Sequence, residues 1–353
     1  MALCGTTPHS SAAAMSLSFT VTAGAKLTNQ TRSRVAVNVR APRAEQTESN
    51  NQQTDTVVMD RRETLKLGLA LGTSVLGSVL LPPNLEEANA ADLTQRFQRG
   101  AYLQSVREKL RVAVKDNQNL VPALMRLALN DALTYDKESK TGGPNGSIIF
   151  ELDRPENRGL KEAVTLLEGV KKDMDVEFET KGGPISWADL IQLGGQSATK
   201  RTFIDAAIRK CGGNEEKGQQ LYQAYGSSGQ WGQFDKLLGR SDVSEADPSG
   251  RVLLWEEASP QEIKERFGQL GIKPRQIAVL SGFLGDQAKI EEKLVADPDF
   301  TPWVKKYQIS RVTVSQTDYE VDLITAFTKL SVLGQTINYE AYSYKVPQKP
   351  FKF

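Results

Sequence analysis

The sequence RLALNDALTYD, residues 126–136, is the most informative stretch of this chain of 353 residues. On a helix, Arg126, Leu129 and Asn130 share one face, because residues at i, i+3 and i+4 lie one above the other. Leu133 follows at i+7 on the same face. Two interpretations are open. The arginine and the amide either face a polar cavity, or the arginine is buried and satisfied by a carboxylate or by backbone carbonyls.

The same helical periodicity continues on both sides of this stretch. The spacing of apolar residues predicts helices over 93–116, 119–133, 158–172, 187–197, 201–210, 262–270, 274–282, 288–296 and 318–333. Ser259-Pro260 is a typical start for the helix at 262–270. Only 251–255 and 311–315 alternate in a way that favours short strands. The sequence therefore predicts an all-α fold.

Several longer motifs follow one another in order over residues 95–335. They are RLALNDALTYD, KTGGPNGSIIF (140–150), ENRGLKEAVTLLEGVK (156–171), ISWADLIQLGG (185–195), IAVLSG (277–282), DPDFTPWVKKY (297–307) and KLSVLG (329–334). Together they resemble the class I haem peroxidases, and among these the ascorbate peroxidases. The resemblance implies the haem-peroxidase-like, two-domain helical fold, with a haem cleft between the domains.

The distal haem side departs from that family. The resemblance implies an Arg, a Trp and a His, of which the His moves a proton between the peroxide oxygens. Here Arg126 is retained, whereas Leu129 replaces the Trp and Asn130 replaces the His. Asn157 matches the asparagine that orients the family His. An amide does not titrate near neutrality, so we expect no intact catalytic group.

The proximal side departs as well. Leu284 stands at the position of the iron ligand, and a leucine side chain offers no lone pair to iron. Gln118 falls where the family has a lysine that helps to bind ascorbate. The family segment after the ligand is missing beyond Gly285, whereas residues 198–238 form an extra segment. We therefore expect no haem, no other cofactor-binding residue and no metal site.

Composition limits the remaining chemistry. The chain has 44 basic and 43 acidic residues, one His and two Cys, with a net charge of +1. This balance gives no reason to expect nucleic acid as a partner. His9 and Cys4 lie in a basic leader, so its removal leaves no histidine and only Cys211, which excludes His-dependent catalysis and an internal disulfide. Cys211, beside Arg209 and Lys210, is either a redox-reactive thiol or an inert single cysteine.

The N-terminus contains two consecutive targeting signals. Residues 1–44 are basic and rich in Ala, Ser and Thr, which is typical of a transit peptide, although a basic tail is the alternative. Residues 45–90 hold a polar linker, then Arg61-Arg62, the apolar run 65–81 and the exit Ala88-Asn89-Ala90. This resembles a twin-arginine signal, with a membrane anchor as the alternative. The two signals together predict the chloroplast thylakoid lumen.

These expectations define two hypotheses of function. Residues 91–240 would form a distal-side lobe that includes the extra segment, and 241–353 a proximal-side lobe with a basic tail. The first hypothesis is a non-catalytic protein that binds thylakoid membrane complexes, such as photosystem II, either soluble or peripherally attached, with a role in oxidative stress or photoprotection. The alternative is an ascorbate-type haem peroxidase with an atypical iron ligand.

Two features leave further alternatives open. The vacated cleft either binds a small molecule, for instance ascorbate, or is filled by its own side chains. The tail at 343–353 has three Lys and no acid. It is either a docking segment for an acidic surface or a membrane, or a frayed terminus.

Overall fold

Helices and the loops between them build all of the protein that the computed structural model describes, namely residues 85–353 without 180–181, 226–229 and 344–353. Within these residues no strand forms, and the one isolated bridge joins Asp136 to Thr141. The prediction of an all-α fold is confirmed. The predictions for residues 1–44, for most of 45–90 and for the tail lie outside the described residues.

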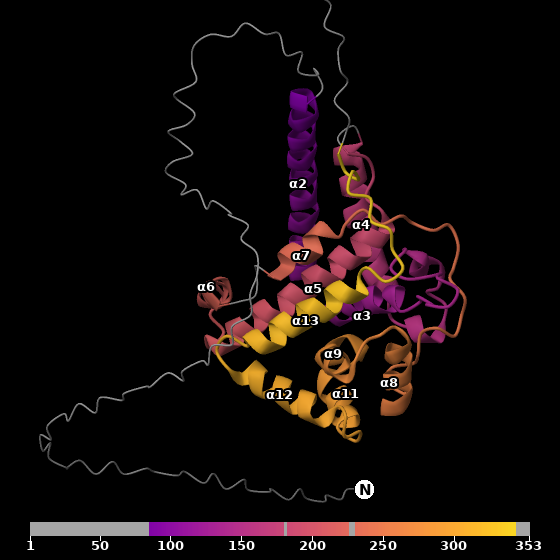
Figure 1. Ribbon diagram of the computed structural model, residues 1–353. Helices are drawn as coiled ribbons and strands as arrows, with labels where there is room; N and C mark the ends of the chain where they lie inside the picture. Colours follow the sequence, from indigo (N-terminus) through magenta and orange to yellow (C-terminus); the bar gives the residue numbers. More distant parts are fainter. Residues whose placement is uncertain (1–84, 180–181, 226–229, 344–353) are drawn as a thin grey trace, which may run out of the picture. The chain divides into compact units, whose positions relative to one another are not determined.

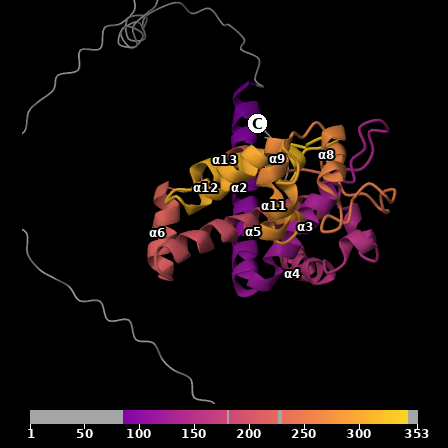
Figure 2. The same cartoon turned by 90° about the horizontal axis from the view of Figure 1, so that it is seen from below.

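The helices run in the following order (Figure 1). They are α2 (Leu85–Asp116), α3 (Val121–Ala132), α4 (Lys161–Phe178), α5 (Trp187–Lys210), α6 (Glu215–Tyr225), α7 (Trp231–Lys236), α8 (Pro260–Gln269), α9 (Pro274–Val279), α10 (Ser281–Leu284), α11 (Gln287–Leu294), α12 (Thr301–Val312) and α13 (Thr317–Leu330). Helices α3 and α4 flank α5, whereas α8, α9, α11 and α12 form a second group that α13 joins to α5. The view from below shows the same grouping (Figure 2).

Both strand candidates are wrong. Residues 251–255 form a loop, in which Trp255 is buried and Leu254 is exposed. Residues 311–312 are the last two of α12, and a bend follows them. The alternation in both stretches reflects the partial burial of a loop and of a helix end. Among the described residues, no neighbouring segment pairs with either stretch through the hydrogen-bond ladder that a strand needs.

Helix α5 is the centre of the first group. The sequence predicted two helices, at 187–197 and 201–210, but nothing between them breaks a helix and the structure has one. The Ser186 hydroxyl caps its start by accepting from the backbone N–H of Asp189 at 3.1 Å. A Cβ on Gly195 would lie 2.6 Å from the Cβ of Ala128, so this glycine lets α3 and α5 approach closely.

The extra segment that the sequence predicted at 198–238 holds the end of α5 and all of α6 and α7. Helix α6 turns back along α5, at the opposite end of α5 from α4 (Figure 2). A Cβ on Gly218 would lie 2.5 Å from Cγ1 of Ile208, which explains why a glycine stands at this contact. The segment therefore packs on the helical body through this close contact of α6 and through α7, whose buried Trp231 and Phe234 contact Phe327 of α13.

A buried ion pair fixes the start of α5 to the second half of the chain. Nη1 of Arg240 lies 2.6 Å from Oδ1 of Asp189, with both side chains fully buried. The same carboxylate accepts from the Tyr342 hydroxyl at 2.6 Å, and Nε of Arg240 donates to the carbonyl of Ser331 at 2.7 Å. Burial and the Asp189 charge raise the pKa of Tyr342, so its hydroxyl stays protonated and donates.

The predicted start of α8 is confirmed in detail. Ser259 accepts from the backbone N–H of Glu262 at 3.2 Å, and Glu262 accepts from the backbone N–H of Ser259 at 2.7 Å. None of the helices within the described ranges is long and apolar enough to cross a membrane. The described residues form one compact unit, and the division into two lobes stays a prediction.

Candidate functional site

Asn130 lies fully buried on α3 and is surrounded by hydrogen-bond partners. Its Nδ2 donates to Oδ1 of Asn157 at 2.9 Å and to the carbonyl of Glu156 at 3.1 Å. Its Oδ1 accepts from Nε1 of Trp255 at 2.8 Å. Both donor hydrogens and the acceptor of this amide are therefore in use within the protein.

Asn157 holds the other side of this pair. Its Nδ2 donates to the carbonyl of Glu151 at 3.0 Å, which orients its Oδ1 toward Asn130. The sequence matched Asn157 to an asparagine that orients a family histidine, and the structure places it in contact with the residue that replaces that histidine. The two asparagines thus form a buried amide pair without a titrating group.

Arg126 lies on the same face of α3 but nearer to solvent. Its Nη2 lies 2.5 Å from Oε1 of Glu256 and donates to the carbonyl of Leu284 at 3.2 Å. A Cβ on Gly285 would lie 3.2 Å from the same Nη2, so the chain after Leu284 passes close to the guanidinium. A carboxylate and a carbonyl therefore bind Arg126, as the second interpretation of the sequence expected, but the side chain is only partly buried and also lines a cavity, as the first expected.

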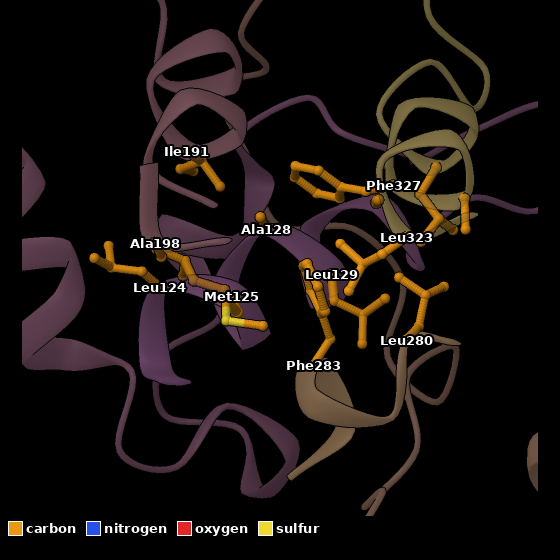
Figure 3. Packing of buried hydrophobic residues seen from close by; sticks show 14 of the residues in the cluster. Leu124, Met125, Ala128, Leu129, Ile191, Ala198, Leu280, Phe283, Leu323 and Phe327 are labelled. Atoms are coloured by element: carbon orange, nitrogen blue, oxygen red, sulfur yellow. The ribbon is translucent and has the colours of Figure 1, made fainter. Parts of the chain in front are cut away.

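Apolar side chains fill the space between α3, α10 and α13. Leu129, Phe283, Leu284 and Phe327 are all fully buried. Figure 3 shows Leu129 and Phe283 pointing toward each other, with Phe327 beside them. The rings of Phe283 and Phe327 have centroids 5.2 Å apart. Leu284 is therefore part of a packed apolar cluster, and its side chain has no atom that could ligate iron.

A cavity of about 590 Å³ opens beside this cluster. Its walls include Arg126, Arg158, Glu256, Phe283 and Tyr319. Arg126 and Arg158 give it a basic side, and Glu256 and Asp286 offset both of these charges. The cavity is a second location, next to the filled space, where a small polar molecule could be held.

Sequence reasoning missed three contributors to the site. Trp255 and Glu256 belong to the loop that the alternation assigned to a strand, so their approach to α3 was not foreseen. Asp131, fully buried beside Asn130, accepts from the backbone N–H of Gly146 at 3.1 Å. Burial raises the pKa of this carboxyl well above its ordinary value.

Two predicted residues lie elsewhere. Gln118 is exposed, in a short 3₁₀ helix (Gln118–Leu120), where its Nε2 donates to the carbonyl of Lys115 at 3.3 Å. Cys211 is a partly exposed free thiol at the C-terminal end of α5. Among the residues with assigned positions, no group of three or more His, Cys, Asp or Glu side chains could hold a metal ion.

Comparison with known proteins identifies the family. The profile of the family described as "Peroxidase" matches residues 106–285, which is half of the chain and includes α3, Asn157 and Leu284. The chain belongs to the peroxidase family. Weaker similarity extends to L-ascorbate peroxidases of Arabidopsis thaliana and rice, so the resemblance seen in the motifs is confirmed.

Two relatives in this peroxidase family are more similar. The chain is 57% identical to the chloroplastic thylakoid lumenal 29 kDa protein of Arabidopsis thaliana over 296 residues, covering 83% of this chain and 84% of that protein. It is 57% identical to the protein of the same name from Solanum lycopersicum over 288 residues, covering 80% and 82%. The predicted localisation in the chloroplast thylakoid lumen is confirmed.

A solved peroxidase-family structure has the same fold. The crystal structure of the TL29 protein from Arabidopsis thaliana is 60% identical, covers 70% of this chain and 99% of the solved chain, and superposes with a TM-score of 0.69. The predicted peroxidase-like helical fold is therefore confirmed for the body of the chain.

Proposed function

We propose that this peroxidase-family protein of the thylakoid lumen is not a catalyst and acts by binding thylakoid membrane complexes, with photosystem II as the first to test. The observation that carries the proposal is the closed hydrogen-bond set of Asn130, which stands at the position of the distal histidine. An amide does not titrate near neutrality, and both hydrogens and the oxygen of this one already bond within the protein, so it supports no proton transfer of the kind that a histidine performs.

The residues present do not fit haem. Leu284 offers no lone pair at the ligand position, and the side chains of Leu129, Phe283 and Phe327 pack against one another where the family cleft would lie. Inserting a macrocycle would require these buried side chains to separate, and each of them stabilises the core through apolar burial. We therefore propose no catalytic step that uses haem.

Exposed apolar side chains supply a surface for a binding partner. On α12 and the bend after it, Ile309, Val312 and Val314 are 66%, 81% and 65% exposed. These three residues lie within six positions of the chain. Burying exposed apolar surface in a contact favours association. We call residues 309–314 the α12 apolar segment and propose it as the contact with the membrane complex.

The experiment is affinity capture from thylakoids solubilised in mild detergent, with the mature full chain as bait at physiological salt. We expect photosystem II subunits to be retained. The variant I309D/V312D should lose them, whereas V176D, which changes an exposed valine on α4, should keep them. A bait that retains no membrane complex, or a protein found only free in the lumen wash, would contradict the proposal.

The alternative function is an ascorbate-type peroxidase with an atypical haem ligand. It is favoured by the retained Arg126, which lines the cavity of about 590 Å³ beside Phe283. Mixing the mature protein with haemin separates the two functions. The non-catalytic proposal predicts that gel filtration removes the haemin, whereas a sharp Soret band and one retained haem per chain would establish the alternative.

A further inference from the structure

A second cavity, of about 470 Å³, lies between α2, α5 and α6, outside the site described above. Its third wall comes from the extra segment, because Gln219, Tyr222 and Gln223 of α6 close the groove between the other two helices. The close contact at Gly218 holds this wall against α5. We call this space the α6 pocket. Its volume is in the range of small-molecule sites.

Basic side chains dominate the lining of the α6 pocket. Helix α2 supplies Arg107, Arg111 and Lys115, and α5 supplies Lys200 and Arg201. The one acidic residue in the lining, within the described chain, is Glu108. A concave surface with five cations and one anion concentrates negative ligands, because low-dielectric walls focus the field.

Four of the five cations already have a carboxylate partner. Arg111 pairs with Glu108 at 2.5 Å, and Lys115 pairs with Glu215 at 3.0 Å. Arg107 lies 3.3 Å from Asp235, and Arg201 lies 2.7 Å from Asp205, its neighbour one turn along α5. These ion pairs neutralise four of the five positive charges. The fifth cation therefore decides whether the pocket prefers an anionic ligand.

Lys200 is the surplus cation. Among the described residues no carboxylate lies within ion-pair distance of its ammonium, which sits 5.2 Å from the ring centroid of Trp231 on α7. Burial lowers its pKa to about 8, with Asp235 acting against that shift and Arg107 adding to it. An ammonium near an aromatic ring, with no described carboxylate within ion-pair distance, has capacity for an anionic partner.

Other donors in the pocket also lack acceptors. The Nε atoms of Arg107 and Arg201 are buried, and each has no hydrogen-bond partner within the described structure. Burial raises the pKa of Tyr222 to about 12, so its hydroxyl remains protonated. A buried donor without an acceptor costs free energy, and the charge of a bound oxyanion would stabilise these incompletely bonded guanidinium groups.

We propose that the α6 pocket binds a small organic anion with carboxylate or phosphate groups, and that Lys200 supplies the charge that selects it. The pocket volume favours a ligand of metabolite size, and the arginines on two facing helices suit a ligand with more than one acidic group. The proposal is independent of the binding of a membrane complex, because the α12 apolar segment and the former haem site do not contribute to this pocket.

The test is calorimetric titration of the mature full chain at pH 7 with citrate and, separately, with inorganic phosphate, each at constant ionic strength set with chloride. We expect at least one of the two probes to bind with one site per chain. K200Q should weaken that binding at least tenfold, whereas K289Q, which removes the same charge from an exposed lysine of α11, should leave it unchanged. If only citrate binds, the pocket selects carboxylate groups. If only inorganic phosphate binds, it selects phosphate groups.

The melting temperature supplies a second readout, which does not require a measurable affinity in the variant. K200M should raise the melting temperature of the free protein, because it removes a poorly solvated charge, and should abolish the stabilisation by the probe. The proposal is overturned if neither probe binds. It is equally overturned if K200Q binds as tightly as the unaltered chain, or if chloride gives the same stabilisation as the probe.

Discussion

The indole Nε1 of Trp255 donates to Oδ1 of Asn130 across 2.8 Å, and both side chains are buried. This bond ties α3 to a loop 125 positions later in the chain. It also explains why a leucine-rich helix carries a buried amide at this point. The bond and its partners lead to the first prediction.

Replacing Asn130 by Leu should cost about 2–4 kcal/mol of unfolding free energy. The change leaves the Trp255 indole N–H and the Asn157 Oδ1 buried without partners, and unsatisfied buried groups cost about 1–3 kcal/mol each. Urea unfolding measures the loss.

A double-mutant cycle with Trp255→Phe isolates the pair. The double variant should be more stable than the sum of the single losses predicts, by about 0.5–3 kcal/mol, because the second change removes the orphaned indole N–H. Strict additivity would mean that the two side chains do not interact in solution.

Asp131→Asn should stabilise the protein at neutral pH. Burial raises the pKa of the Asp131 carboxyl, so between its ordinary value near 3.8 and its raised value the folded state binds a proton that the unfolded state lacks. Stability from this group is therefore full at low pH and falls as pH rises through that window. Thermal melts of both proteins from pH 4 to pH 8 should diverge as pH rises.

The amide introduced by this substitution retains an oxygen that can accept from the backbone N–H of Gly146, but it loses one of the two acceptors that serve Gly146 and Ile148. The pH dependence of the difference between the two proteins, rather than its size at one pH, therefore reports the charge. Glu151, whose pKa burial also raises, stays present in both proteins, and its charge is one cause of the raised pKa of Asp131. Parallel melting curves across the whole pH range would show that Asp131 does not titrate in this way.

Asp189→Asn should destabilise the protein by about 3–5 kcal/mol. The change leaves the Arg240 guanidinium buried beside a neutral amide, and breaking a buried ion pair from one side typically costs this much. Glu108→Gln, which breaks the exposed pair with Arg111, is the control and should leave the denaturation midpoint unchanged. Equal effects of the two variants would contradict the role assigned to burial.

Gly195→Ala should cost about 1–3 kcal/mol. The added methyl group would meet the Cβ of Ala128 at 2.6 Å and Cζ of Phe327 at 3.0 Å, so α3 and α13 must both move away from α5. The control is Gly169→Ala at an exposed position of α4, where nothing lies within 4 Å of the new atom. That variant should gain about 0.5–1 kcal/mol from helix propensity. A neutral Gly195→Ala would imply that α5 can shift freely.

The sequence allowed the fold class and most helices to be predicted, because a helix that packs on one side repeats its apolar residues every three or four positions. It did not reveal that 187–210 is continuous, since polar residues such as Gln196 and Thr199 are buried against neighbouring helices. Helices α6, α7 and α12 were missed as well. Helix α6 is mostly polar, and it packs through the close approach at Gly218, the partly buried Tyr222 and an ion pair of Glu215 with Lys115 rather than through a broad apolar face.

At the site, the motifs identified Arg126, Leu129, Asn130, Asn157 and Leu284, and the structure brings all five to the junction of α3, the loop at Asn157 and α10. The partners could not be predicted, because a loop residue such as Trp255 carries no periodic signal. The hydrogen bonds at this site join segments that are distant in the chain. The spacing of residues within one motif does not encode such bonds.

Two buried tryptophans stand at the two sites of this molecule. Trp255 donates to Asn130 at the candidate functional site, and Trp231 lies beneath Lys200 at the α6 pocket. The emission wavelength of an indole depends on the polarity and charge around it, so each ring is a built-in optical reporter of its own surroundings. The chain has two further tryptophans, Trp187 and Trp303. Replacing these two and one of the site tryptophans by Phe would leave a single indole, whose fluorescence follows the occupancy of its own site in the unlabelled protein.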